Sequence, residues 1–206
     1  MIGIDRKFSE SFLAGVLIGY SDVDITEGAS FADGKSLAIG PYFGAKLSEN
    51  LLLDGFVTTA RPDYTTNNGS FKSKRTSYGL SLRGFLESGS TLITPAIELR
   101  GFSEDQPAYG TVAANKITSS NARASVRFDF PEMFGGAETV PYFSLGADHG
   151  RSSSTATGKS DFTSGRFGLG LSDTSGPGTL TLDMDYGKVR SDVHDFGIRM
   201  RYLISF

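Results

Sequence analysis

The chain ends in His194-Asp195-Phe196-Gly197-Ile198-Arg199-Met200-Arg201-Tyr202-Leu203-Ile204-Ser205-Phe206, and this stretch decides the fold. From Phe196 onward every even position is apolar or aromatic, and every odd position except Leu203 is polar or glycine. This period of two predicts a strand with one apolar and one polar face. Strands in soluble sandwiches usually stop after about five or six residues, whereas about ten alternating residues cross the hydrocarbon layer of a bilayer. We therefore predict a membrane strand whose apolar face meets lipid.

The composition narrows the class of protein. The 206 residues suit one domain or one mid-sized barrel. A mean hydropathy of -0.15 argues against membrane helices, but alternating barrel strands average out near neutral. The absence of cysteine excludes disulfides, thiolate catalysis and Cys-based metal sites. The net charge of -3 gives no support for nucleic acid as a partner.

Alternating segments recur along the whole chain. They predict strands at residues 2–8, 12–23, 36–47, 51–60, 73–86, 91–102, 117–130, 139–150, 161–171, 179–186 and 194–206. Short turns between them mostly alternate with long polar loops, which we expect at residues 22–35, 61–72, 103–116 and 151–160. Outer-membrane barrels have short periplasmic turns and long outer loops. This sorting favours a barrel over a soluble antiparallel β-protein.

The count of about eleven strands carries a prediction of its own, because single-chain bacterial barrels have an even number of strands. The first and last predicted strands both run toward the periplasm, so they are parallel and cannot pair antiparallel at the seam. We therefore expect a barrel of twelve strands, with one rising strand before Met1. Residues 1–5 have neither the basic leader nor the apolar core of a signal peptide. An outer-membrane protein must be exported, so we expect a fragment, a mature numbering or the tail of a longer protein.

The order of several motifs resembles the translocator domain of autotransporters over nearly the whole chain. Residues 12–22 resemble that family's early "leucine, glycine, glycine-tyrosine-serine" strand, and residues 36–55 resemble its next hairpin. Residues 94–104 resemble its central strand and the following loop, and residues 140–143 and 187–202 continue the pattern. The terminal phenylalanine resembles the end of bacterial outer-membrane barrels, which their assembly machinery is thought to read. By this resemblance the C-terminal assembly signal comprises Tyr202, Ile204 and Phe206.

The resemblance implies an all-β fold, an antiparallel up-and-down transmembrane β-barrel in the outer membrane of a Gram-negative bacterium. Residues 1–206 would form this one domain, and the first strand, a linker helix and a passenger would lie outside them. Its implied function is to anchor and export its own N-terminal passenger, without enzymatic activity and without a cofactor. The implied partners are the passenger and linker helix, outer-membrane lipid and lipopolysaccharide, and the barrel assembly machinery. We expect a monomer that binds no nucleic acid.

The polar faces of the predicted strands supply the candidate site. The residues expected to line the lumen are Arg83, Glu98, Arg100, Arg123, Arg127, Asp129, Arg166, Asp183, Asp185, Arg199 and Arg201. Such mixed charges could hydrate a pore and hold a polar linker, or they could pair simply to satisfy one another. A barrel of this size is wide enough in principle for a helix about 10–12 Å in diameter. Gly15, Gly19, Gly168 and Gly170 on the same face either leave room for that helix or let the sheet bend.

Two other functions stay open. The chain could be a stand-alone porin or adhesin whose outer loops act. It could also be an outer-membrane hydrolase that uses His149, beside Asp148, or His194, between Asp192 and Asp195. A hydrolase needs a base aligned with a nucleophile or water and an orienting group, and here only proximity in sequence suggests one.

The basic cluster Lys72-Ser73-Lys74-Arg75 lies where a predicted outer loop meets a strand. It would contact anionic lipopolysaccharide or be a solvated run of charges. Two histidines and no cysteine do not favour a zinc site.

Overall fold

The computed structural model describes residues 2–27, 30–134, 138–174, 178–190 and 193–204. These residues form one 14-stranded sheet. Its main path consists of β1 (Ile2–Ser9), β2 (Phe12–Glu27), β3 (Ser30–Ser48), β4 (Leu51–Ala60), β7 (Lys74–Gly84), β9 (Thr91–Gln106), β10 (Asn115–Asp129), β11 (Thr139–Ser154), β12 (Gly158–Asp173), β13 (Gly178–Arg190) and β14 (Val193–Ile204). Three short strands lie off this path, namely β5 (Asp63–Thr66), β6 (Gly69–Lys72) and β8 (Leu86–Ser88). In the part of the chain described here, no helix is long and apolar enough to cross a membrane.

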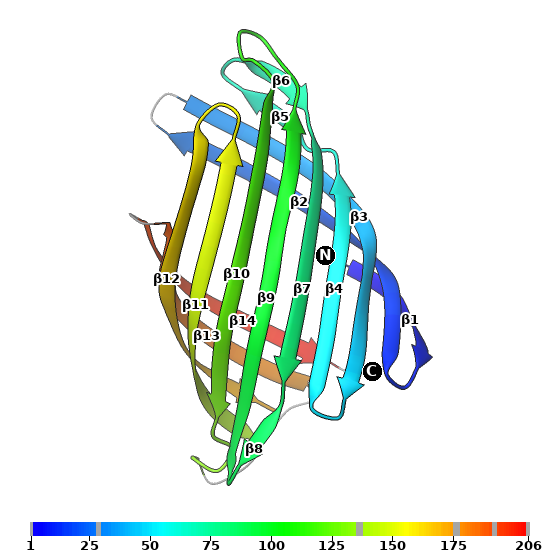
Figure 1. Ribbon diagram of the computed structural model, residues 1–206, viewed down its shortest axis with the longest axis vertical. Helices are drawn as coiled ribbons and strands as arrows, with labels where there is room; N and C mark the ends of the chain where they lie inside the picture. The colour runs from blue at the N-terminus through cyan, green and yellow to red at the C-terminus, as the bar shows by residue number, and fades with distance from the viewer. Residues whose placement is uncertain (1, 28–29, 135–137, 175–177, 191–192, 205–206) are drawn as a thin grey trace.

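Each strand of the path pairs antiparallel with the next one in the chain (Figure 1). The short strands extend this order without changing it. β5 continues the ladder of β4 on β3, β6 folds back on β5, and β8 continues the pairing of β7 with β9. The predicted up-and-down antiparallel fold is therefore confirmed, and the path has the expected count of about eleven strands.

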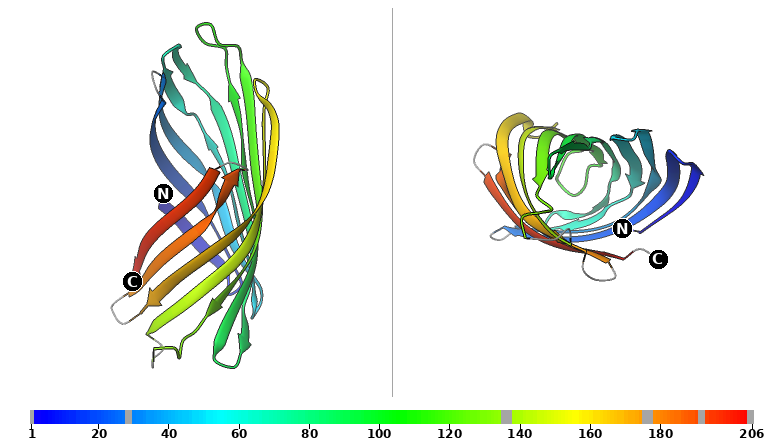
Figure 2. Two further views of the ribbon diagram at one scale, coloured as in Figure 1. Left: turned by 90° about the vertical axis from the view of Figure 1, so that its left-hand side faces the viewer. Right: turned by 90° about the horizontal axis from the view of Figure 1, so that it is seen from below.

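The sheet curls around a central space (Figure 2). Seen end-on, β1 and β14 lie on the same side of the curl, but no pairing joins them among the described strands, so the sheet is not closed. Because consecutive strands alternate in direction along this path, β1 and β14 run the same way. We call the end of the sheet with the tight β1–β2, β3–β4 and β8–β9 turns the turn end, and the opposite end the loop end.

Burial across the sheet is the reverse of that in a soluble protein. Large apolar side chains are exposed along the path, including Ile198 at 65% and Met200 at 75%. Among the described residues the only buried apolar side chains are Ala60, Pro62 and Tyr142, whereas Glu104 and Asp148 are buried carboxylates. An outward apolar face of this extent needs an apolar solvent, and a bilayer supplies one.

The loop end corrects the predicted connections. β2 and β3 stay paired as far as Glu27 and Ser30, and β11 and β12 as far as Ser154 and Gly158. The loops expected at residues 22–35 and 151–160 are therefore mostly strand, and the one at residues 61–72 contains β5 and β6. The loop at residues 103–116 is shortened at both ends by β9 and β10. The sequence turns polar there because the strands leave the apolar layer, and backbone pairing continues in water.

Candidate functional site on the concave face

The concave face carries all the residues that were expected to line a lumen. They alternate along their strands with exposed apolar side chains, which points them to the opposite side of the sheet. By strand they are Arg83 on β7, Glu98 and Arg100 on β9, Arg123, Arg127 and Asp129 on β10, Arg166 on β12, Asp183 and Asp185 on β13, and Arg199 and Arg201 on β14. That this face lines a sealed lumen stays a prediction.

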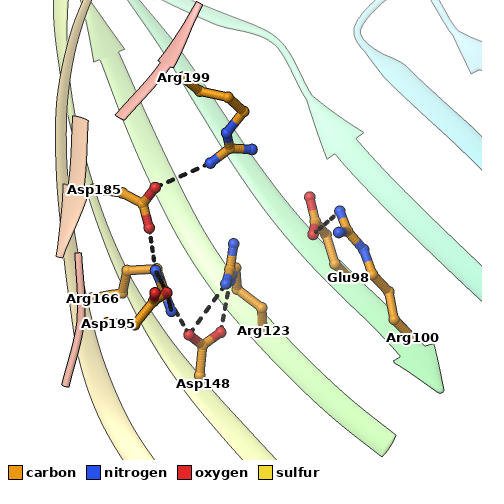
Figure 3. A network of polar contacts seen from close by, with 8 residues as sticks. All are labelled: Glu98, Arg100, Arg123, Asp148, Arg166, Asp185, Asp195 and Arg199. Carbon is orange, nitrogen blue, oxygen red and sulfur yellow. Dashed lines mark hydrogen bonds and ion pairs between the residues drawn. The ribbon is translucent and has the colours of Figure 1, made fainter. Parts of the chain in front are cut away.

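A continuous ion network crosses this face from β10 to β14 (Figure 3). Arg123 donates from Nε and Nη2 to the two carboxylate oxygens of Asp148, at 2.6 and 3.2 Å. Arg166 donates from Nε to Asp148 at 2.8 Å, and its Nη1 donates to Asp185. Arg199 then donates to the second oxygen of Asp185 at 3.0 Å.

Arg166 is the hub of the network. It reaches β11, β13 and β14 together, because it also donates to Asp195 at 3.3 Å. Its side chain is 13% exposed and that of Asp148 is 2% exposed. Charges this buried are tolerated only when each is paired and hydrogen-bonded. The network therefore fixes the relative positions of the last four strands of the path.

Three further pairs occupy the same face. Arg83 donates to Asp54 at 2.6 Å, and Arg100 donates to Glu98 at 2.7 Å. Arg127 pairs with Asp129, and its guanidinium lies 3.4 Å from the centre of the Tyr142 ring. Of the predicted set, Asp183 is half-buried and Arg201 is exposed.

A separate cluster ties the loop end together. Arg75 donates to the buried Glu104 at 2.6 Å and to the hydroxyl of Tyr64 at 2.7 Å. The ring of Tyr64 packs on Phe71, which stacks on Tyr109 at a centroid distance of 4.2 Å. Burial raises the pKa of the Tyr64 phenol above its ordinary value, although Arg75 opposes this shift. The cluster attaches the β5–β6 hairpin to the connection that follows β9.

The family model for the autotransporter beta-domain matches residues 1–192. The chain belongs to the autotransporter β-domain family. The β-domain is accordingly an outer-membrane translocator for its own passenger, located in a Gram-negative bacterium. A search of curated proteins finds no match.

Solved structures agree with this fold at low sequence identity. The β-domain of the Bordetella autotransporter BrkA superimposes with a TM-score of 0.70 at 19% identity, covering 97% of this β-domain and 85% of that chain. The translocator domain of NalP from Neisseria meningitidis gives 0.60 at 13% identity, covering 96% and 75%. LpxR from Salmonella typhimurium gives 0.52 at 8% identity, covering 96% and 84%.

Sequence reasoning missed several charged members of the site. Asp148 and Asp195 entered it only as the neighbours of His149 and His194, and Asp54 and Glu104 were not proposed. A signal for Asp148 was present, because it alternates with the outward residues Leu145 and Ala147 on β11. Strand parity alone would have assigned it to the polar face of the β-domain.

Three of the four concave glycines, Gly15, Gly168 and Gly170, do not leave open space in the way considered above. A Cβ atom on Gly170 would come within 2.3 Å of the Tyr142 ring, and one on Gly168 within 2.5 Å of Oγ of Ser144. A Cβ atom on Gly15 would lie 2.3 Å from the carbonyl oxygen of Ile4. Side chains and backbone of the β-domain wall therefore already fill these positions. Aromatic rings that cover glycines on neighbouring strands stabilise a bent sheet.

Asp148 and Asp195, the described acids beside the two histidines, do not orient them. His149 bonds to Oγ1 of Thr163 at 2.9 Å, whereas Asp148 turns to the opposite face and binds arginines. His194 contacts the hydroxyl of Tyr186 at 2.5 Å, whereas Asp195 faces Arg166. Asp192 lies outside the described residues.

The basic cluster is divided between two environments. Arg75 turns to the concave face and pairs with Glu104, and Ser73 is buried. Lys72 is exposed and forms an ion pair with Asp63 at 3.2 Å. Only the two lysines therefore remain on the outside of the β-domain.

The assembly signal is only partly described. Tyr202 lies in β14 and is 50% exposed on the apolar face. The backbone of Ile204 pairs with Gly178. Phe206 lies outside the described residues. The role of these three residues in assembly stays a prediction.

Proposed function

We propose that the concave face lines the route by which the passenger of this β-domain crosses the outer membrane. The ion network supports this most directly, because its charges all face the space that the strands surround while the apolar side chains face outward. A linker segment inside the barrel would contact the predicted lumen residues. Their role is to hydrate and hold that segment.

We also propose that a twelfth strand completes the barrel. The edges at β1 and β14 run in the same direction, so a single strand running the opposite way can pair antiparallel with both. Pairing through one intermediate strand separates β1 from β14 by about 10 Å, which is twice the spacing of neighbouring strands.

A cross-linking experiment tests this closure, because the chain has no native cysteine. Cysteines replace Ile4 in β1 and Ile198 in β14 of the complete protein in the outer membrane. We expect no direct disulfide, since that bond needs Cβ atoms about 3.5–4.5 Å apart, but we expect efficient cross-linking by a bis-maleimide of about 10 Å. A rapid direct disulfide would show that β1 and β14 meet without an intermediate strand.

The β-domain acts, in this proposal, without enzymatic chemistry of its own. The outward orientation of His149 and His194, with Asp148 and Asp195 on the other face, supports this view. The further partners that we propose are outer-membrane lipid along the apolar face, lipopolysaccharide near Lys72 and Lys74, and the assembly machinery at the end of β14. The working unit is a monomer.

Surface display tests the export function. The complete reading frame, with an epitope tag upstream of Met1, is expressed in a Gram-negative host, and intact cells are labelled with antibody. We expect the tag to be accessible on intact cells, and to be lost from the surface when residues 202–206 are removed. A folded barrel in the outer membrane whose tag stays in the periplasm would refute export and favour the stand-alone porin or adhesin.

A further inference from the structure

The ion pairs of the concave face share an orientation, with the carboxylate against the wall and the guanidinium above it. In each of five pairs the arginine side chain is much more exposed than its acid. The exposed fractions are 32% and 2% for Arg75 and Glu104, 65% and 23% for Arg100 and Glu98, 32% and 2% for Arg123 and Asp148, 34% and 11% for Arg127 and Asp129, and 62% and 20% for Arg199 and Asp185.

Among the described residues, three contacts depart from this pattern. Arg83 and Asp54 are equally exposed, at 41% and 40%. Arg166, at 13%, is more buried than Asp185 at 20% and Asp195 at 43%, because Arg166 lies among three carboxylates. The most exposed arginines of the described pairs are Arg100 and Arg199, and Arg123, at 32%, lies on β10 between their strands.

This orientation gives a nearly neutral face strongly exposed cationic groups at Arg100 and Arg199. A charge at 2% exposure is shielded from the lumen by its partner, whereas a guanidinium at about 60% exposure presents its N–H groups there. Arginine has five N–H donors, and Arg100 and Arg199 each use a single nitrogen in the bonds to Glu98 and Asp185. Their remaining donors suit a carboxylate, which a guanidinium can bind through two parallel hydrogen bonds.

The exposed donors are distributed around the face and do not converge on one point. Arg100, Arg123 and Arg199 belong to β9, β10 and β14, and Figure 3 shows their guanidinium groups turned toward the space that these strands surround. A single small anion meets at most a part of this set. A polypeptide with several carboxylates can contact the separate arginines at the same time.

We propose that the concave face is a recognition surface for an acidic polypeptide segment, held through its carboxylates by Arg100, Arg123 and Arg199. This inference rests on the proposed function, because it assigns a chemistry to the segment that occupies the barrel. It makes the exposed arginines the determinants of which segments the lumen accepts.

A peptide-binding experiment tests the surface. The protein is purified from outer membranes in detergent, and three labelled helical peptides of equal length are titrated by fluorescence anisotropy, with glutamate, glutamine or lysine at the same positions. We expect the glutamate peptide to bind at least about tenfold more tightly than the glutamine peptide, and its affinity to fall as salt increases. The lysine peptide is expected to bind more weakly than either.

Matched variants locate the interaction. Arg100→Gln with Arg199→Gln is expected to weaken binding of the glutamate peptide about three- to tenfold, and the two lysine replacements to restore part of the loss. Lys116→Gln with Lys159→Gln removes the same charge at the loop end, outside the concave face, and should leave binding unchanged. Heat-dependent gel mobility and β-sheet circular dichroism first establish that each variant is folded.

Several results would overturn the inference. One is equal binding of the glutamate and glutamine peptides, and another is an equal loss of peptide binding in the loop-end control variant. A third is complete displacement of the glutamate peptide by sodium sulfate when sodium chloride of matched ionic strength does not displace it. The last result would indicate a site for small anions.

Surface display separates this inference from the proposed function. A barrel that displays its passenger without discriminating among the peptides refutes only the acidic segment, whereas failed display with intact peptide binding refutes the export route.

Discussion

Replacing Asp148 with asparagine should destabilise the barrel more than neutralising a carboxylate that pairs with a single exposed arginine. Its carboxylate accepts bonds of 2.6 and 3.2 Å from Arg123 and of 2.8 Å from Arg166, and its side chain is only 2% exposed. The substitution keeps the size and one acceptor oxygen of the side chain. It removes the negative charge that lies between two guanidinium groups.

The expected magnitude follows from the surroundings of the two arginines. Breaking a fully buried ion pair costs about 3–5 kcal/mol. Here the cost is lower, because Arg123 is 32% exposed and can be hydrated, and Arg166 retains Asp185 and Asp195. We expect a loss of about 2–3 kcal/mol in the free energy of unfolding, which lowers the folding equilibrium constant about 30- to 150-fold.

Urea unfolding in detergent micelles measures this loss. The chain has no tryptophan, so far-ultraviolet circular dichroism follows the transition. Glu98→Gln is the matched control, since Glu98 bonds to one arginine that is 65% exposed, and it should cost less than about 1 kcal/mol. If Asp148→Asn and Glu98→Gln shift the midpoint equally, the network does not hold the last strands together as argued.

Three other changes have defined outcomes. In β3, a Cβ atom on Gly40 would lie 1.9 Å from the carbonyl oxygen of Val57, whereas one on Gly44 would lie 3.5 Å from Leu13. In the same urea assay, Gly40→Ala should therefore reduce the free energy of unfolding by about 1–3 kcal/mol or more, and Gly44→Ala by less than about 0.5 kcal/mol. Equal losses would refute the close approach at Gly40. An arginine on the lipid face of a barrel strand is costly at the middle of the membrane and tolerated near its surface. Leu169→Arg on the apolar face of β12 should therefore reduce the free energy of unfolding by about 2–4 kcal/mol, and Gly165→Arg, four residues nearer the loop end, by at most about 1 kcal/mol. The reverse order would place the membrane elsewhere along the strand. Because burial raises the pKa of Tyr64, folding favours its neutral phenol, so this stabilisation is complete below the unfolded pKa of about 10 and is lost as the pH rises through the folded pKa. The phenolate absorbance that Tyr64→Phe removes should therefore titrate above the ordinary tyrosine range, and a component at the ordinary pKa would contradict the burial.

The strands and their faces follow from the sequence because a period of two fixes which residues share a face. Alternation placed Arg123, Arg166 and Arg199 on the polar side without any structure. The ends of the strands at the loop end could not be found in this way, because polarity indicates contact with water and does not indicate where backbone pairing stops. Ser153 and Ser154 were therefore assigned to a loop, although they belong to β11.

The pairings within the site depend on register, which the pattern leaves open. Gly146 lies opposite Arg166, and Asp148 opposite Ser164. A slip of two residues would keep every side chain on its face, yet it would change the separation of Arg166 and Asp148 along the strands. The relative exposure of each acid and arginine depends further on side-chain rotamers. The sequence thus predicts which charges share a surface, but the orientation of the pairs comes only from the structure.

The strictly sequential order of the strands has a consequence for assembly. Every ladder of the path joins neighbours in the chain, so each hairpin forms by closing a short connection at a small cost in entropy. Only the seam must bring together the two ends of the sheet, and until it does, two edges carry unpaired N–H and C=O groups that hydrocarbon cannot satisfy. The sheet can therefore grow hairpin by hairpin at the membrane surface, but its full entry into the bilayer must coincide with the closing of the ring.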